Sequence, residues 1–132
     1  MTILTDSSVW IDYFNGVNNW QTNKLDNCLG KEEIVIGDLI LAEVLRGFKL
    51  DKDYNLAKKN LMYLPILKMI DTFIAIKSAD NFRVLRKKGI TVRKTVDMII
   101  GTYCIENNLY LLYKDRDFDV MEKPLGLKVL SS

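Results

Sequence analysis

Short apolar runs alternate with longer stretches of helical periodicity along the whole chain. The runs predict buried strands, at 2–5, 34–36, 66–67, 109–113 and 127–130. Between them, apolar residues recur at helical spacing and predict helices, at 9–14, 20–29, 39–48, 51–63, 71–88 and 95–104. Strands that are apolar throughout are typical of a parallel sheet covered on both faces. The pattern therefore predicts an α/β protein, a three-layer α/β/α sandwich with a mainly parallel sheet.

Polar residues next to the predicted helices indicate where these helices begin. Ser7 and Ser8 are expected to cap the first helix, and Asp38 the helix that begins at Leu39. On the helix over 71–88, the apolar spacing predicts a buried face that contains Ala75, Ala79, Phe82 and Leu85.

The length of 132 residues suits one domain over 1–132, and no linker or internal repeat divides it. There is no run of 18 apolar residues, so no transmembrane helix is expected. The first residues lack the positive and apolar regions of a signal peptide. We therefore expect a cytoplasmic protein that does not enter the membrane.

The chain contains no histidine, which excludes several kinds of site. Ser-His-Asp and Cys-His catalytic groups are ruled out, as is zinc or iron held by histidine. The only cysteines, Cys28 and Cys104, lie far apart in apolar stretches and are expected to be reduced and buried. Glycine-rich phosphate loops are absent. An enzyme of this composition must use carboxylates, hydroxyls, lysines or arginines.

Four carboxylates occupy positions where chemistry is expected. Asp6 and Asp115 follow predicted strands, and ligands of open α/β sheets bind at the carboxyl ends of strands. Asp97 lies in the first turn of a predicted helix, and Glu43 lies among apolar residues, where a charge needs a partner. Each also has a structural interpretation. Asp6 and Asp115 would be helix caps, Asp97 would complement a helix dipole, and Glu43 would pair with Arg46.

If these acids converge, electrostatics favour a bound metal ion. Two carboxylates about 5 Å apart repel each other by roughly 3 kcal/mol at an effective dielectric constant near 20. A divalent cation relieves this repulsion, and carboxylate oxygens select hard ions. The predicted cofactor is Mg²⁺ or Mn²⁺.

Basic residues are concentrated between Arg83 and Lys94, although the net charge of the chain is only +2. Such a run is either a solvated helix end or a surface that contacts phosphates, because basic side chains supply most non-specific affinity for nucleic acids. The candidates for contact with an RNA backbone are Lys87, Lys88, Arg93 and Lys94.

Four segments resemble, in order, the motifs of PIN-domain proteins of the VapC toxin type. They are LTDSSVWIDYF at 4–14, LAEVLRGF at 41–48, TVDMII at 95–100 and LLYKDRDF at 111–118. Each motif is weakly specific alone. Together they occur in the family's order and span nearly the whole chain, so the resemblance is specific.

The resemblance implies a metal-dependent endoribonuclease, the toxin of a type II toxin–antitoxin pair, which hydrolyses RNA phosphodiesters with a metal-activated water. The catalytic and metal-binding residues that it implies are Asp6, Glu43, Asp97 and Asp115, with Asp117 as a further possible ligand. Ser7 or Ser8 matches a hydroxyl that supports the first acid. At Tyr113 relatives often carry histidine or threonine, so no role follows for this residue.

The implied partners are an RNA substrate, a cognate antitoxin protein that covers the acidic groove, and a second copy of the chain in a homodimer. Trp10, Tyr13, Phe14 and Phe48 form an aromatic helix face, which is either part of the core or a groove for a partner. The core is favoured, because aromatic residues at helical spacing are normally buried. The alternative to the nuclease is a non-catalytic PIN-like module that binds RNA or protein. A phosphatase of the haloacid-dehalogenase kind is disfavoured, because two serines follow Asp6 where that class needs D-x-D.

Overall fold

Five parallel strands form one sheet in the computed structural model, which describes residues 1–132. The strand order is β3-β2-β1-β4-β5, and every neighbouring pair is parallel. The strands are β1 (Thr2–Thr5), β2 (Glu33–Gly37), β3 (Ile66–Leu67), β4 (Tyr110–Leu112) and β5 (Lys128–Val129). The five strands predicted from the apolar runs are thus confirmed, with ends that differ by at most one residue.

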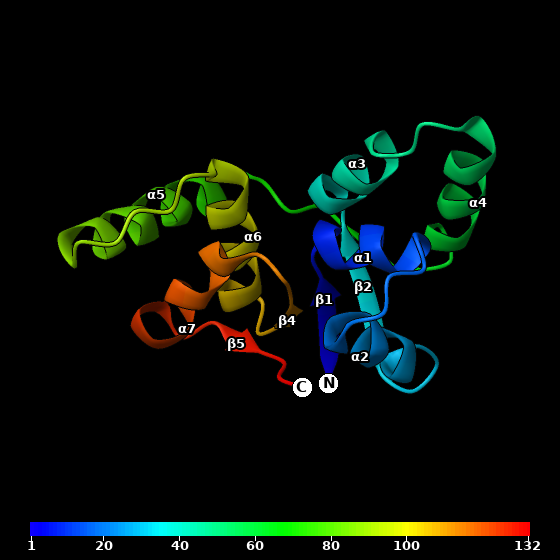
Figure 1. Cartoon of the computed structure of the whole chain (residues 1–132). Helices are drawn as coiled ribbons and strands as arrows, with labels where there is room; N and C mark the ends of the chain where they lie inside the picture. Colours follow the sequence, from blue (N-terminus) through cyan, green and yellow to red (C-terminus); the bar gives the residue numbers. More distant parts are fainter.

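Seven α-helices and one 3₁₀ helix cover the sheet. They are α1 (Ser7–Phe14), α2 (Trp20–Cys28), α3 (Asp38–Arg46), α4 (Asp51–Leu61), α5 (Thr72–Lys87), α6 (Thr95–Glu106), η1 (Arg116–Phe118) and α7 (Asp119–Leu125). In Figure 1, α1 to α4 lie to one side of the strands and α5 to α7 lie to the other. The predicted three-layer α/β/α arrangement is confirmed.

The central strand β1 is the most deeply buried part of the core. Ile3 and Leu4 have no exposed surface, and Leu4 lies in register with Val35 on β2 and Leu111 on β4. Strands covered on both faces need apolar side chains in both directions, which is why these segments show no polar alternation.

The strand order places the ends of β1 and β4 next to each other. From β1 the chain builds outward to β2 and β3, then returns to the other edge of β1 with β4 and β5. The reversal creates a crevice at the carboxyl ends of β1 and β4, where ligands of open α/β sheets bind. Asp6 enters this crevice directly after β1, and its backbone N–H donates to the carbonyl oxygen of Leu112 at 2.9 Å.

Two predicted helix caps are wrong by one residue. The N-cap of α1 is Asp6, so Ser7 and Ser8 lie in the first turn, and the Asp6 side chain makes no capping hydrogen bond. The N-cap of α3 is Gly37, and Asp38 is the first helical residue. The Asp38 carboxylate accepts hydrogen bonds from the backbone N–H groups of Leu39 and Met69, so it joins α3 to the segment after β3.

The predicted buried face of α5 is confirmed for two of its four residues and wrong for the other two. Its buried residues are Ile74, Ser78 and Leu85, and of the four expected only Leu85 is among them. Phe82 is half-buried and packs against the core, whereas Ala75 and Ala79 are exposed. The physical reason is visible in Figure 1, where α5 extends away from the sheet and packs along α6, so one narrow stripe suffices to bury it. Phe73, Ile76 and Val84 of α5 are exposed to solvent.

Candidate metal centre

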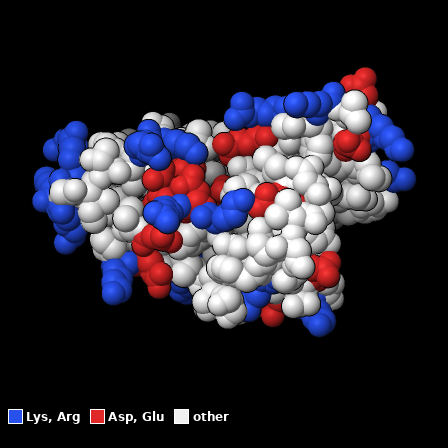
Figure 2. Space-filling model, in the orientation of Figure 1, with Lys and Arg blue, Asp and Glu red and all other residues white.

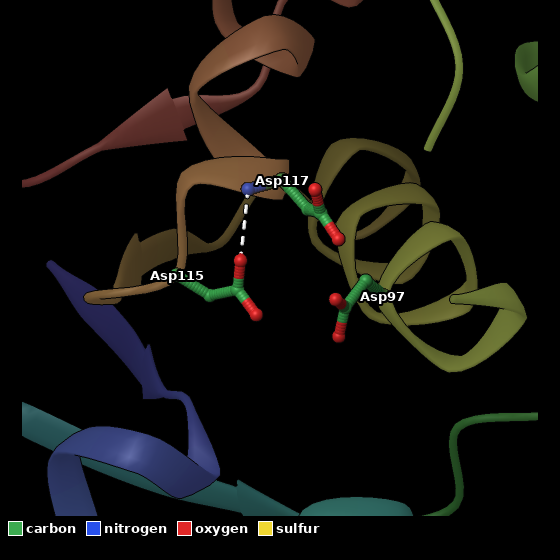
Figure 3. A group of neighbouring side chains, drawn as sticks. All are labelled: Asp97, Asp115 and Asp117. Atoms are coloured by element: carbon green, nitrogen blue, oxygen red, sulfur yellow. Dashed lines mark hydrogen bonds between the residues drawn. The ribbon is translucent and has the colours of Figure 1, made fainter. Parts of the chain in front are cut away.

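Three aspartates from two separate parts of the chain converge at the crevice. Asp97 comes from the first turn of α6, Asp115 from the loop after β4, and Asp117 from η1. One carboxylate oxygen of each lies within 4.8 Å of the others, and Figure 3 shows the three side chains facing a common space. The Asp115 carboxylate also accepts a hydrogen bond from the backbone N–H of Asp117 at 3.0 Å, which holds the two residues in one turn. Asp115 is thus a helix cap, as its structural interpretation predicts, and it also lies in the cluster of aspartates.

Asp6 and Glu43 extend this cluster without joining its tightest group. Asp6 is buried, and its carboxylate accepts a hydrogen bond from the Ser8 hydroxyl at 3.2 Å. No side-chain hydrogen bond joins Ser7 to Asp6, so Ser8 is the supporting hydroxyl of the two candidates. The charges of Glu43 and Asp115 are close enough to raise the pKa of Asp6. Five acids thus share one electrostatic environment, which we call the acidic centre: Asp6, Glu43, Asp97, Asp115 and Asp117.

Four of the five acids carry a buried oxygen that has no hydrogen-bond partner. These atoms are Asp6 Oδ1, Glu43 Oε1, Asp97 Oδ2 and Asp117 Oδ2. A buried polar atom without a partner is rare and destabilising in native proteins. Arg46 does not satisfy Glu43, because no ion pair joins them among the three in the structure. The unpaired oxygens are the ligand atoms that a hard divalent cation takes, so the acidic centre fits such a cation.

The pKa values of the two most buried acids are strongly raised. Burial raises the pKa of Asp6 from 3.8 to about 6, and the neighbouring acids add to this effect. Burial also raises the pKa of Asp97 to about 7, with the charges of Asp6 and Asp115 as further causes. In Asp115 the opposite holds, because the backbone N–H of Asp117 and the ammonium of Lys94 lower its pKa. The acidic centre therefore accumulates more negative charge than its surroundings neutralise.

Lys94 and Lys114 each form an ion pair with an aspartate, but only Lys94 pairs with a member of the acidic centre. Lys94 Nζ lies 3.2 Å from Asp115 Oδ2. Lys114 Nζ lies 2.5 Å from Asp12 Oδ2, on α1 and outside the acidic centre. Figure 2 shows basic atoms next to the acidic patch near the middle of this face. The pair between Lys114 and Asp12 joins residues 102 positions apart, so the sequence carries no signal that predicts it.

The other RNA-backbone candidates lie at different places. Arg93 is close enough to the acidic centre that its charge lowers the pKa of Asp115. Lys87 and Lys88 lie at the end of α5, which extends to the far left in Figure 1, and Figure 2 shows a second group of basic atoms there. The basic run of the sequence is therefore divided between the acidic centre and a remote helix end.

Tyr113 packs next to the crevice and has a structural role there. Its hydroxyl donates to the Asp119 carboxylate at 2.6 Å, and its ring packs on Phe118 with 5.4 Å between centroids. Burial and this hydrogen bond raise the pKa of the Tyr113 hydroxyl. The residue thus joins the end of β4 to α7.

The aromatic face is only partly core. Trp10 is buried, whereas Tyr13, Phe14 and Phe48 are half-buried and pack on one another at centroid distances near 6 Å. A cavity of about 210 Å³ opens beside Trp10. Both cysteines are free thiols, and Cys104 is buried while Cys28 is half-buried.

The chain belongs to the PIN domain family, whose model matches residues 3–124. Among curated proteins it is 28% identical over 131 residues to the VapC ribonuclease Mb1587 of Mycobacterium bovis and to ribonuclease VapC11 of Mycobacterium tuberculosis, covering 98% of each chain.

Solved structures share the fold at low identity. VapBC2 from Rickettsia felis, bound to a DNA fragment from its promoter, aligns with a TM-score of 0.78, at 17% identity and 98% coverage of both chains. FitAcB from Neisseria gonorrhoeae aligns with a TM-score of 0.76, at 16% identity, covering 98% of this chain and 96% of that one.

No helix of the structure has the length and apolar character needed to cross a membrane.

Proposed function

We propose that this chain is a metal-dependent endoribonuclease and the toxin of a type II toxin–antitoxin pair. The observation that carries the proposal is the acidic centre, with four buried carboxylate oxygens that have no partner. The names of the curated relatives, both ribonucleases, support the choice of RNA as the substrate.

The residues that would hold the cation are Asp97, Asp115 and Asp117, together with Asp6 and Glu43. Mg²⁺ or Mn²⁺ at this place supplies a water of lowered pKa and offsets charge on the phosphoryl oxygens. Asp6 and Asp97 must lose their protons to act as ligands, and because their pKa values are raised to about 6 and about 7, both are largely ionised only above pH 7. The Ser8 hydroxyl orients Asp6. No histidine is needed as a general base in this arrangement.

The RNA backbone would be held by basic residues on two surfaces. Arg93 and Lys94 border the acidic centre, and Lys87 and Lys88 provide a second contact at the end of α5. Contacts of this kind act on phosphates of any sequence, so they supply affinity rather than specificity. We also propose a cytoplasmic location, where such an RNA substrate is found.

The proposed protein partner is an antitoxin that covers the acidic centre. One solved structure that shares this fold is a toxin–antitoxin complex from Klebsiella pneumoniae. An active nuclease must be inhibited in its own cell, and a basic side chain from the antitoxin would neutralise the acids. Copurification of the chain with the product of a neighbouring reading frame, and loss of RNA cleavage in the complex, would test this partner.

A second copy of the chain is the proposed partner of α5. The helix exposes Phe73 and Ile76 by 56% and 58%, although both are apolar. Beside it, a groove of about 610 Å³ lies between α5 and α6. Asp71 lies at the start of α5 and a cluster of cations at its end, so two copies that cross in antiparallel orientation bring opposite charges together. This pairing would bury the apolar residues that the monomer leaves exposed.

Cleavage of total RNA by the purified, partner-free protein tests the nuclease function. We expect discrete fragments with Mg²⁺ or Mn²⁺ and none with EDTA. Asp6→Asn and Asp97→Asn are expected to abolish cleavage, while Asp53→Asn on the exposed surface of α4 is the matched control. Manganese binding, measured by calorimetry on the same variants, separates loss of the cation from loss of catalysis. Tight manganese binding without any RNA cleavage would instead support the non-catalytic binding module.

A further inference from the structure

Lys94 is the only basic side chain that forms an ion pair with the acidic centre. The structure contains three ion pairs, and the other two join Met1 to Glu32 and Lys114 to Asp12. The Lys94 side chain is 62% exposed and Asp115 is 30% exposed, so their contact lies at the solvent side of the centre. The ammonium is therefore accessible from the direction in which a substrate must arrive.

The backbone of Lys94 is fixed by the same turn that holds Asp97. Lys94 is the N-cap of α6, and its carbonyl oxygen accepts hydrogen bonds from the backbone N–H groups of Asp97 and Met98 at 3.1 and 3.3 Å. Its Cα thus keeps a constant position relative to the acids. Its side chain is a flexible four-carbon arm with a strongly hydrated charge, which changes partners at little cost. This combination suits a residue that contacts a ligand at the centre.

The net charge of the acidic centre indicates what the Lys94 side chain does. Five carboxylates surround the site, and the two charges of one divalent cation do not neutralise them. The remaining negative charge repels a phosphodiester that approaches the cation. A positive group at the solvent side offsets this repulsion at the point where phosphate oxygens lie, and it stabilises charge that develops on them. Lys87 and Lys88 cannot do this from the far end of α5.

We propose that Lys94 binds the scissile phosphate and is distinct in role from the other basic residues. In the free protein its ammonium pairs with Asp115. When RNA enters, the ammonium transfers from the carboxylate to a non-bridging oxygen of the phosphate that is cleaved. The inference rests on the proposed nuclease function and deepens it, since it separates one reaction-specific contact from the general backbone contacts. It also implies that Lys94 competes with a cation for Asp115 while RNA is absent.

Three variants test this role: Lys94→Met, Lys94→Arg and Lys87→Met. The matched control is Lys59→Met, on the exposed surface of α4. Initial rates over a range of RNA concentrations give kcat and KM. We expect Lys94→Met to lower kcat by a factor on the order of 10 to 100, because a transition-state contact is lost. Lys94→Arg should restore much of it, since arginine keeps the charge. Lys87→Met should raise KM and leave kcat unchanged, and Lys59→Met should change neither.

Manganese binding without RNA gives a second readout that does not depend on activity. Removal of the competing ammonium should make Lys94→Met bind Mn²⁺ several-fold more tightly than the wild type, measured by calorimetry or by the electron paramagnetic resonance signal of free Mn²⁺. Far-ultraviolet circular dichroism confirms that each variant is folded. A Lys94→Met protein with wild-type kcat overturns the inference, as does one whose KM alone changes. Absence of cleavage by the wild type would overturn the nuclease function itself, so the two failures are distinguishable.

Discussion

Replacing Asp97 with asparagine is expected to stabilise the metal-free protein, although it should abolish catalysis. Asp97 is 5% exposed and one of its oxygens has no partner, so its ionised form is destabilised by burial and by the neighbouring acids. Asparagine has nearly the same shape and no charge. Binding sites commonly carry such local instability, because the ligand relieves it.

The magnitude follows from the pKa of Asp97. Its rise from 3.8 to about 7 means that the folded state binds the proton more tightly than the unfolded state. The stability that this protonation confers is present in full below pH 4 and is lost as the pH rises through 7. At about 1.4 kcal/mol per pKa unit, the wild type should be less stable than Asp97→Asn by about 4 kcal/mol at pH 8 and by about 2 kcal/mol at pH 5.

Urea unfolding in EDTA, followed by tryptophan fluorescence, measures this difference. Trp10 is buried and therefore reports loss of the core. Asp53→Asn, at an exposed position of α4, is the control and should change stability by less than about 0.5 kcal/mol. If Asp97→Asn is no more stable than the wild type at pH 8, or if the difference stays constant between pH 8 and pH 5, the electrostatic account of the acidic centre is refuted.

Three further predictions concern the cation, the loop after β4 and the partner of α5. Mn²⁺ should raise the thermal unfolding midpoint more at pH 8 than at pH 6, because protons on Asp6 and Asp97 compete with the cation; equal shifts would contradict this competition. Asp12→Ala should lower the free energy of unfolding by about 1 kcal/mol through loss of the ion pair with Lys114, and a double-mutant cycle with Lys114→Met checks the coupling. Ile76→Asp should yield a monomer by light scattering at concentrations where the wild type is a dimer, and a variant that remains dimeric would exclude α5 as the interface.

The local sequence predicts the positions of those acids in the acidic centre that follow the end of a strand. Asp6 follows β1 directly, and Asp115 follows β4 by three residues. Because the strands are apolar and parallel, their carboxyl ends lie at one edge of the sheet, and the acids that follow them lie there too. Asp97 was also predicted, from its motif and its place in the first turn of α6. For these residues, position along the chain and position in space are linked by the regular geometry of strands and helices.

Tertiary structure decided which of the acids lie closest together and which of their oxygens lack hydrogen-bond partners. Asp117, a secondary candidate in the sequence, belongs to the tightest group because Asp115 caps the turn that contains it. Glu43 reaches the site from α3, and no local signal shows that Arg46 leaves it unpaired. Which oxygens remain without partners depends on every neighbouring element at once, so burial and pKa could not be derived from spacing.

The sequence by itself determined the class of fold, the five strands, the helices between them and the choice of oxygen chemistry. These features depend on apolar periodicity and on residue types, which are local properties. Only the tertiary structure decided the strand order, the exposed face of α5 and the partners of Lys94 and Lys114. Lys94 contacts an acid 21 residues away, and Lys114 contacts one 102 residues away. Such contacts arise because packing of the sheet brings distant segments together. The apolar periodicity of the chain does not predict which distant side chains then meet.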